Sequence, residues 1–236
     1  MASSRPPLSK VVALLEKLYG APGKLSSHDV FELILFENAA YLVDDARRDE
    51  VFQTLKKRVG TSPKAVLSAP FERLVAAIRS GGMRPEERAG KLLEAASIAD
   101  EVGLENLRKL MKTSPKDARK ILKRFPGMGD PGADRLLLIA GSLVTLAPES
   151  NGLRVLMRLG FAKEDRNWSK TWRAASEAVA SELPDEPAWL LKAHLLLRRH
   201  GQELCRRTEP RCDVCPLAKG CVFGSTTPRP EARARR

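Results

Sequence analysis

Apolar residues recur at steps of three and four along most of the chain, the spacing that gathers side chains on one face of a helix. Examples are Val11, Leu14, Leu15 and Leu18, and then Phe71, Leu74, Val75 and Ile78. Polar and apolar residues do not alternate over any long segment, and aromatic residues make up only 5% of the chain. Strand signals are therefore absent, and the pattern predicts an all-α protein.

Capping residues indicate where several of these helices begin and end. Segments 61–64 and 113–116 both read Thr-Ser-Pro-Lys, which places a serine N-cap before a proline at the first helical position. We interpret this likeness as shared capping and not as an internal repeat. Asp44 and Asp45 are expected to cap a helix that begins near Ala46. The glycines expected at helix ends are Gly81, Gly82, Gly103 and Gly160.

Two stretches are too apolar to lie on a surface, namely residues 30–36 and 136–144. We expect both to be central helices, the second following directly on residues 125–130. The longest uncharged run, residues 136–148, is shorter than the roughly 20 residues that span a bilayer, so no membrane span is expected. Residues 1–10 lack the apolar core of a secretory signal, which predicts a cytoplasmic protein.

The charge balance points toward polyanions. Lysine and arginine outnumber aspartate and glutamate by 41 to 29, and the sequence pI is about 9.8. Nucleic acid is the leading partner for such a chain, with a merely solubilising basic surface as the alternative. Residues 223–236 are expected to form a disordered basic tail, because the segment TTPRPEARARR is rich in proline and arginine. Such a tail adds only nonspecific phosphate affinity.

The four cysteines of the chain all lie near its C-terminus, with the spacing C-x6-C-x2-C-x5-C. They are Cys205, Cys212, Cys215 and Cys221. One irregular segment that supplies four thiolates is typical of a 4Fe-4S cluster, whereas structural zinc sites usually take two close pairs separated by a longer arm. The cluster is favoured and zinc is the alternative. Disulfides would need an oxidising compartment, which the expected cytoplasmic location does not provide.

A second motif joins a helix ending near Arg124 to the apolar helix that follows it. It reads Phe125-Pro126-Gly127-Met128-Gly129-Asp130 and suggests a helix-hairpin-helix element. Glycines allow positive φ and a close approach of another backbone, so the bare amides of the turn can donate to a phosphate. A plain glycine turn between packed helices is the alternative.

With both motifs in view, the chain resembles the endonuclease III branch of the helix-hairpin-helix DNA glycosylases, from about Leu8 to Val222. The resemblance is carried by residues 125–129, by Asn151-Gly152-Leu153-Arg154-Val155, and by His200-Gly201 leading into the cysteines. It implies a two-lobed fold, with a six-helix barrel at residues 22–143 and a helical 4Fe-4S domain from residues 1–21 and 144–222. The implied partner is double-stranded DNA with a damaged or mispaired base, bound across the cleft between the lobes by a monomer.

Such enzymes break the N-glycosidic bond of a flipped-out base. A carboxylate stabilises the positive charge that develops on the sugar, and members that also cut the strand use a lysine that forms a Schiff base. In this chain the position of that lysine is Pro131, which has no nucleophile, and Lys123 does not match it. Counting five residues back from Arg154 reaches Glu149, one methylene longer than the aspartate of the family. Glu149 is therefore the catalytic candidate, with an acidic residue in the first turn of a helix as the alternative.

Other positions carry weaker expectations. Asp130 and Asp134 are reserve carboxylates. Asn38 and Tyr41 are base-pocket candidates, and Asn38 could instead be a buried amide that caps a turn. His194 and His200 are not needed as metal ligands beside four cysteines. The predicted DNA-binding residues are Gly127, Met128, Gly129, Asn38, Arg206, Arg207, Arg211 and Lys219.

The favoured function is base excision without Schiff-base strand cleavage. One alternative is a bifunctional glycosylase that retains abasic-site lyase activity through an unaligned amine. The other is a noncatalytic binder of DNA lesions or branches. The lesion depends on packing around the pocket, which the sequence does not fix.

Overall fold

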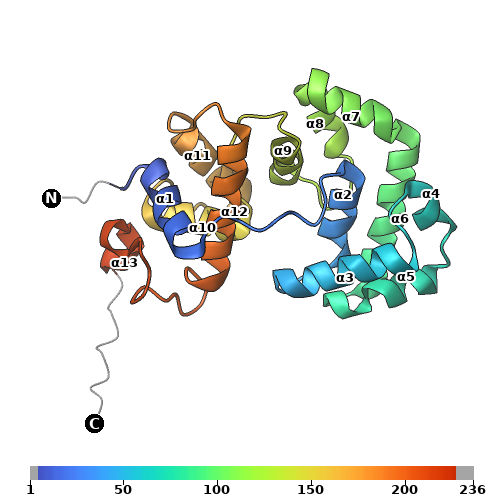
Figure 1. Cartoon of the computed structure of the whole chain (residues 1–236), viewed down its shortest axis with the longest axis horizontal. Helices are drawn as coiled ribbons and strands as arrows, with labels where there is room; N and C mark the ends of the chain where they lie inside the picture. Colours follow the sequence, from blue (N-terminus) through green and yellow to red (C-terminus); the bar gives the residue numbers. More distant parts are fainter. Residues whose placement is uncertain (1–4, 227–236) are drawn as a thin grey trace, which may run out of the picture. The chain divides into compact units, whose positions relative to one another are not determined.

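The computed structural model of the protein describes residues 5–226. The chain divides into two compact units, one formed by Lys24–Leu143 and the other by Met1–Gly23 together with Val144–Arg236 (Figure 1). We call them the hairpin unit and the cysteine unit. The sequence had placed their first boundary at residue 22. Within the described residues the structure contains helices and one isolated β-bridge between Tyr41 and Gly82, which confirms the all-α prediction.

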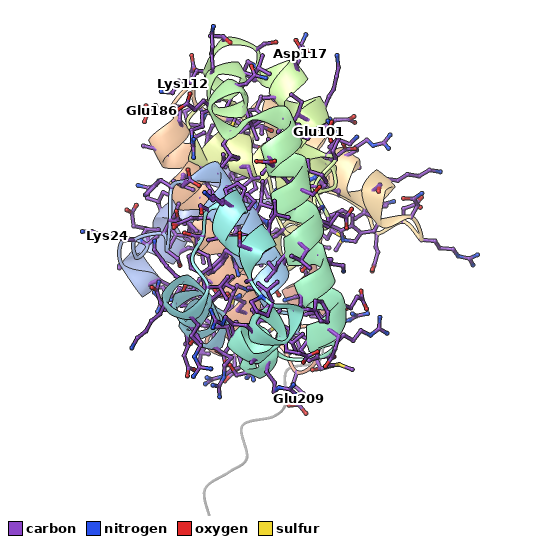
Figure 2. All side chains as sticks on the ribbon, turned by 90° about the vertical axis from the view of Figure 1, so that its right-hand side faces the viewer. Lys24, Glu101, Lys112, Asp117, Glu186 and Glu209 are labelled. Carbon is purple, nitrogen blue, oxygen red and sulfur yellow. The ribbon has the colours of Figure 1, made fainter. Side chains whose placement is uncertain are left out.

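The hairpin unit contains eight α-helices among its described residues. They are α2 (Val30–Ala39), α3 (Asp45–Arg58), α4 (Pro63–Ser68), α5 (Phe71–Ile78), α6 (Pro85–Val102), α7 (Leu104–Thr113), α8 (Pro115–Leu122) and α9 (Asp130–Ile139), with a 3-10 turn at Arg79–Gly81. Charged residues lie on the outside of the later helices, as Glu101, Lys112 and Asp117 illustrate (Figure 2). No helix of the described chain has both the length and the apolar character needed to cross a membrane.

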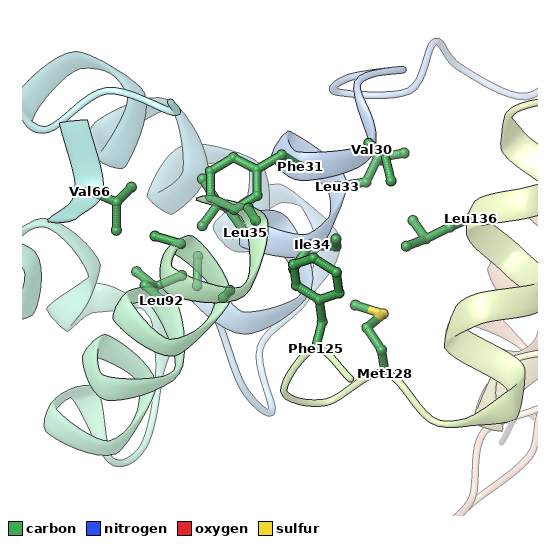
Figure 3. Close-up of a cluster of buried hydrophobic side chains, with 14 of the residues drawn as sticks. Val30, Phe31, Leu33, Ile34, Leu35, Val66, Leu92, Phe125, Met128 and Leu136 are labelled. Atoms are coloured by element: carbon green, nitrogen blue, oxygen red, sulfur yellow. The ribbon is translucent and has the colours of Figure 1, made fainter. Parts of the chain in front are cut away.

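Helix α2 lies at the centre of this unit, as its apolar sequence predicts. Phe31, Ile34 and Leu35 are completely buried, and they share one apolar cluster with Leu92 of α6 and Met128 (Figure 3). Each fully buried side chain of this size contributes on the order of 1.5–3 kcal/mol relative to exposure. Nearly all of α2 faces protein, which explains why its sequence shows no polar face.

The predicted helix starts are found, with one difference in capping. Ser62 accepts a hydrogen bond from the amide of Ala65 at the start of α4, as predicted. Asp44 caps α3 by accepting from the amide of Arg47, so this helix begins at Asp45. Helix α8 begins at Pro115, but the Ser114 hydroxyl donates to the Asp117 carboxylate and does not cap the backbone.

The prediction of a helix over residues 136–144 was wrong at its C-terminal end. Helix α9 ends at Ile139, and Gly141 has a φ of 67° that breaks the helix. Leu136 is buried with its neighbours, whereas Val144 is 45% exposed. An uninterrupted apolar run thus covers the end of a central helix and the connection to the next unit.

The cysteine unit is built around three longer helices and the N-terminal one. Its described helices are α1 (Leu8–Tyr19), α10 (Ser150–Leu159), α11 (Trp168–Ala180), α12 (Pro187–Glu203) and α13 (Val222–Thr226), with a 3-10 turn at Ala218–Gly220. Helix α12 packs against both α1 and α10, and Leu15, Leu156 and Leu197 are buried in the core between them. The tail was expected to begin at residue 223. Helix α13 continues to Thr226, and residues 227–236 lie outside the described part.

Candidate nucleic-acid interface and metal centre

The four cysteines surround one pocket at the end of α12. Cys205 follows this helix, Cys212 and Cys215 lie in the loop after it, and Cys221 precedes α13. We call residues 205–221 the cysteine loop. The pocket is also lined by apolar side chains that include Leu159 and Leu217. The loop therefore gathers four sulfur atoms around one space, although its first and last cysteines are sixteen positions apart in the sequence.

Nitrogen donors point at three of these sulfur atoms. A guanidinium nitrogen of Arg158 lies 3.4 Å from Sγ of Cys205, and the amide of Gly224 lies 3.4 Å from Sγ of Cys221. Nε2 of His200 lies 3.4 Å from Sγ of Cys215. Donors directed at sulfur suit thiolates, the form in which cysteine binds metal.

The imidazole of His200 links this pocket to α1. Nδ1 of His200 is 3.1 Å from the hydroxyl of Tyr19; His200 is buried and Tyr19 is half-buried. Burial lowers the pKa of His200 to about 4, and burial together with the charge of Glu203 raises the pKa of Tyr19 to about 12. The histidine is then neutral at pH 7 and the tyrosine keeps its proton. The Tyr19 hydroxyl can donate to Nδ1, which leaves Nε2–H to donate to sulfur.

Without a bound metal the thiols favour their protonated form. Burial, together with the neighbouring cysteines, raises the pKa of Cys215 to about 11, and burial raises the pKa of Cys221. A metal would reverse this preference, because coordinated thiols lose their protons. Within the described residues, no group of three or more histidine, cysteine or acidic side chains is placed to hold a metal ion. Four thiols with nitrogen donors directed at three of their sulfur atoms are the type of ligand set that iron-sulfur centres use.

Two arginines of α10 hold the backbone of the cysteine loop. Arg154 donates to the carbonyls of Cys205 and Gly201, and Arg158 donates to the carbonyl of Arg206 at 2.7 Å. Hydrogen bonds from a charged donor contribute about 1.5–3 kcal/mol each, so these contacts fix the start of the loop. The predicted DNA-binding side chains of this loop are all exposed. They are Arg206, Arg207, Arg211 and Lys219.

The hairpin motif forms a tight turn between α8 and α9. Gly127 has a φ of 75°, which favours glycine, whereas Gly129 has an extended backbone with a φ of −75°. The positive φ expected of glycine in this turn is therefore found at Gly127 and not at Gly129. Both glycines are exposed, so their backbones are accessible to a ligand. Met128 between them is only 3% exposed and packs in the core of the hairpin unit, so its side chain anchors the turn to that core.

Asn38 ties the end of α2 to this turn. Its amide nitrogen donates to the carbonyls of Ile34 and Pro126, each at 2.9 Å, and the side chain is 6% exposed. A Cβ added to Gly127 would lie 3.1 Å from Oδ1 of Asn38, so the turn packs closely on this amide. Asn38 thus fills the structural role that was left open as its alternative. Direct contact of Asn38 with DNA stays a prediction.

The two reserve carboxylates are occupied by basic side chains. Asp130, at the start of α9, pairs with Lys123 at 2.6 Å and with Arg119 at 3.2 Å. Asp134 is buried and accepts two hydrogen bonds from Arg119. This network holds α8 against α9 next to the hairpin, and the amine of Lys123 belongs to it.

Glu149 is the N-cap of α10. One oxygen of its carboxylate accepts from the amide of Gly152 at 2.7 Å, and the other accepts from the side chain of Asn151 at 2.9 Å. Asn151 in turn accepts from Arg154, so the carboxylate is oriented by a chain of hydrogen bonds. The indole nitrogen of the buried Trp172 donates to the carbonyl of Pro148, which fixes the backbone before the cap.

Sequence reasoning missed an exposed apolar tip on the hairpin unit. Tyr41, Leu42 and Met83 are 53%, 73% and 59% exposed. They lie on two backbone segments joined by the bridge from Tyr41 to Gly82, and Leu42 has a φ of 57°. Tyr41 was expected to line a base pocket, and the structure places it at this tip, beyond the end of α2.

The tip depends on a buried arginine. The guanidinium of Arg88, with a side chain only 4% exposed, donates to the carbonyls of Ala39, Ile78 and Gly82. These contacts satisfy carbonyls at the end of α2 and around the 3-10 turn. An arginine that donates only to backbone carbonyls leaves no local signal in the sequence. The tip could therefore not be predicted from the pattern of apolar and polar residues.

Comparisons with known proteins agree with these features. No family model matches the chain. Endonuclease III of Rickettsia conorii is 32% identical over 111 residues, which is 46% of this chain and about half (48%) of that protein. Endonuclease III of Sulfolobus acidocaldarius is 25% identical over 198 residues, which is 84% of this chain and 83% of that one.

A solved structure shares the fold over almost the whole chain. The structure of a non-covalent endonuclease III-DNA complex superimposes with a TM-score of 0.72 at 20% identity and covers 92% of this chain and 95% of that one. The chain therefore has the fold of that endonuclease III structure. Its sequence is similar to endonuclease III over most of its length, as its motifs predicted.

Proposed function

We propose that the protein is a DNA base-excision glycosylase that hydrolyses the N-glycosidic bond of a damaged or mispaired base in duplex DNA. The observation that carries the proposal is Glu149, a carboxylate with both oxygens held by hydrogen bonds at the start of α10, in an endonuclease III-like fold. Preorganised charge of this kind stabilises a developing cation without reorganising during the reaction.

In the proposed reaction the bond between the base and C1′ of the sugar breaks, and its electron pair leaves with the base. Glu149 stabilises the resulting oxocarbenium-like charge. Water adds its oxygen to C1′ and loses a proton to the carboxylate, and the departing base takes up a proton. The products are a free base and an abasic site.

Hydrolysis is favoured over Schiff-base chemistry because Pro131 occupies the position of the family's lysine. The nearby amine of Lys123 is paired with Asp130 at 2.6 Å. A Schiff base requires an amine that can reach the sugar, and this ion pair engages the Lys123 amine at the hairpin.

Several exposed features support the proposed binding of DNA. The backbones of Gly127 and Gly129 can meet a phosphate at the hairpin, and exposed cations of the cysteine loop can meet others. Leu42 and Met83 at the apolar tip can enter a base stack, as apolar wedges do in proteins that open the duplex. Such an insertion would compensate for a base that has been flipped out.

We also propose that Cys205, Cys212, Cys215 and Cys221 hold a 4Fe-4S cluster. When bound, the cluster supplies iron-thiolate bonds that close the cysteine loop. Arg158, His200 and the amide of Gly224 donate toward the sulfur atoms and orient them. The cluster is structural in this proposal, and Glu149 performs the chemistry.

Base release from a panel of damaged and mispaired duplexes tests the proposal. The parent should release at least one base, and Glu149→Gln should slow release by roughly 100-fold or more, because the carboxylate charge is lost. Gln can still accept the hydrogen bond of the cap, so the melting temperature should change little. Glu177→Gln, at an exposed position of α11, is the control and should react like the parent. Equal rates for Glu149→Gln and the parent would remove Glu149 from the mechanism.

Borohydride trapping on abasic DNA separates the alternatives. The proposal predicts no covalent adduct. An adduct that disappears in Lys123→Ala would favour a bifunctional lyase. Tight duplex binding with no base released from any substrate would favour a noncatalytic binder.

A further inference from the structure

A groove that shares Arg158 and Phe223 with the cysteine pocket runs along α10 in the cysteine unit. It lies against the loop between α10 and α11, the cysteine loop and α13, and its volume is about 1110 Å³. Its walls include Ser150, Lys163, Trp168, Arg207 and Phe223. Pockets for small molecules usually measure about 300–1,000 Å³, so an open groove of this size suits an extended ligand. We call it the α10 groove.

Cations predominate along the groove. Arg154, Arg158, Lys163 and Arg207 line it, against one acidic residue, Glu164. The two arginines of α10 already donate to backbone carbonyls of the cysteine loop. Lys163 and Arg207 are exposed and pair with no carboxylate within the described residues. Two cations are thus available to an anionic ligand.

One aromatic surface in the groove is also available. Arg5 lies over the ring of Phe161 at 4.1 Å, and Arg158 lies over the ring of Phe223 at 4.3 Å. Trp168 is 45% exposed, and in the described part of the chain no cation or ring lies against its indole. A free indole face beside free cations is the combination that binds unpaired nucleotides, because bases stack on it while phosphates meet the charges.

The indole is held by an ordered segment. Asn167 caps α11 by accepting from the amide of Ser169 at 2.9 Å, and its own amide donates to Asp165. The amide of Asp165 donates at 2.8 Å to the hydroxyl of Thr171, which is 2% exposed. A stacking surface on a fixed scaffold costs little conformational entropy when a ligand binds.

We propose that the α10 groove is a binding site for an unpaired nucleic-acid strand, with a base stacked on Trp168 and a phosphate on Lys163. A duplex cannot use the indole in this way, because its bases are already stacked on one another. Ser150, which lines the groove, directly follows Glu149 in the chain, so a strand passing the catalytic candidate can reach the groove. The site goes beyond base excision in duplex DNA and does not require that the protein be a glycosylase.

Anisotropy titrations on the purified full-length protein test this site. The probes are a blunt lesion-free duplex and the same duplex with a single-stranded extension of about eight nucleotides at either the 3′ or the 5′ end. For the parent, one extension should lower the Kd by about 10-fold, since one stacked base and one phosphate contact are gained. Trp168→Ala and Lys163→Ala should each lose most of this gain and keep the Kd for the blunt duplex.

Two further variants keep the test specific. Trp168→Phe retains a ring and should keep part of the gain. Lys170→Ala removes an exposed lysine of α11 that does not line the groove and should keep all of it. No gain from either extension in the parent would overturn the proposal. So would a gain that survives in Trp168→Ala, or an equal loss in Lys163→Ala and Lys170→Ala. Base release from the blunt lesion duplex, measured in parallel, reports on the glycosylase independently.

Discussion

The hairpin and the cysteine loop offer backbone and charge to a ligand, yet they are held in place by different forces. Under the hairpin, Phe125 and Met128 are 2% and 3% exposed and join the large apolar core of their unit. In the cysteine loop, residues 205–221, Leu217 is the single buried side chain, and this loop is described in full. Hydrophobic burial therefore supports one element and leaves the other nearly unsupported.

Polar contacts only partly compensate for the small hydrophobic burial of the cysteine loop. The loop backbone receives hydrogen bonds from Arg154 and Arg158, which lie on one side of it. These hydrogen bonds reach the carbonyls of residues 205–207, and Nε2 of His200 lies 3.4 Å from Sγ of Cys215 further along the loop. Ordering each loop residue costs roughly 1–2 kcal/mol of backbone entropy, so a further stabilising contribution is required. Metal-thiolate bonds provide one of sufficient size.

Replacing one metal ligand should have the largest effect. Cys212→Ser is expected to lose the cluster and to lower the melting temperature by about 10 °C or more, because structural metal sites contribute on the order of 10 kcal/mol. Calorimetry and absorbance near 400 nm measure both effects. Asp213→Ser, at the neighbouring exposed position, is the control and should leave both unchanged. An unchanged melting temperature in Cys212→Ser would contradict a structural cluster.

A substitution beneath the hairpin should have the next largest effect. Asn38→Leu removes the donor to the Pro126 carbonyl and leaves that partly buried group unpaired, at a cost of about 1–3 kcal/mol. We expect a melting temperature lower by about 5 °C or more and a duplex affinity about 10-fold weaker. Asn106→Leu, on the exposed face of α7, is the matched control. Full duplex affinity in Asn38→Leu would show that the hairpin does not depend on this amide.

Arg158→Lys tests the polar support of the cysteine loop. Lysine keeps the charge but cannot reach the carbonyls of Cys205, Arg206 and Arg207 together. The cluster should be lost a few-fold faster in air, followed as the decay of absorbance near 400 nm. Arg173→Lys, on the exposed face of α11, should decay at the parent rate. Identical decay in all three proteins would exclude a supporting role for Arg158.

The smallest expected effect is on the melting temperature of a variant at Glu182, whose carboxylate accepts from the amide at the start of α1. Burial raises the pKa of Glu182, but hydrogen bonds from the Leu8 amide and from Arg5 outweigh it, so that the net pKa is lowered. A carboxylate with a lowered folded-state pKa adds stability above its unfolded pKa of about 4.3, and this stability is lost as the pH falls. Glu182→Gln should therefore melt slightly below the parent at pH 7, and this difference should shrink as the pH falls below about 4.3. A difference that grows toward low pH would reverse the assigned sign.

The sequence predicted those features whose causes are local. Apolar residues spaced three and four positions apart predicted the helices. Ser62, which stands before a proline, predicted the start of α4. The cysteine spacing predicted that four thiols gather at one place, and they line one pocket. In each case the residues that determine the feature lie close to one another in the sequence.

Features that depend on distant residues could not be predicted. The role of Asn38 requires Pro126, which lies 88 positions away, and the apolar tip requires Arg88, which lies 49 positions from Ala39. The extent of α9 was overestimated because an apolar run does not reveal which part of it leaves the core. Neither periodicity nor capping residues report on such contacts.

Analysis of iron and acid-labile sulfide in the purified protein tests the difference between the two elements most directly. The account predicts about four iron atoms and about four sulfide ions per chain, which are lost together when the cysteine loop unfolds. Substitutions beneath the hairpin, such as Asn38→Leu, should leave this iron and sulfide content unchanged. Stoichiometric zinc without sulfide, or a metal-free protein with a fully folded cysteine loop, would contradict it.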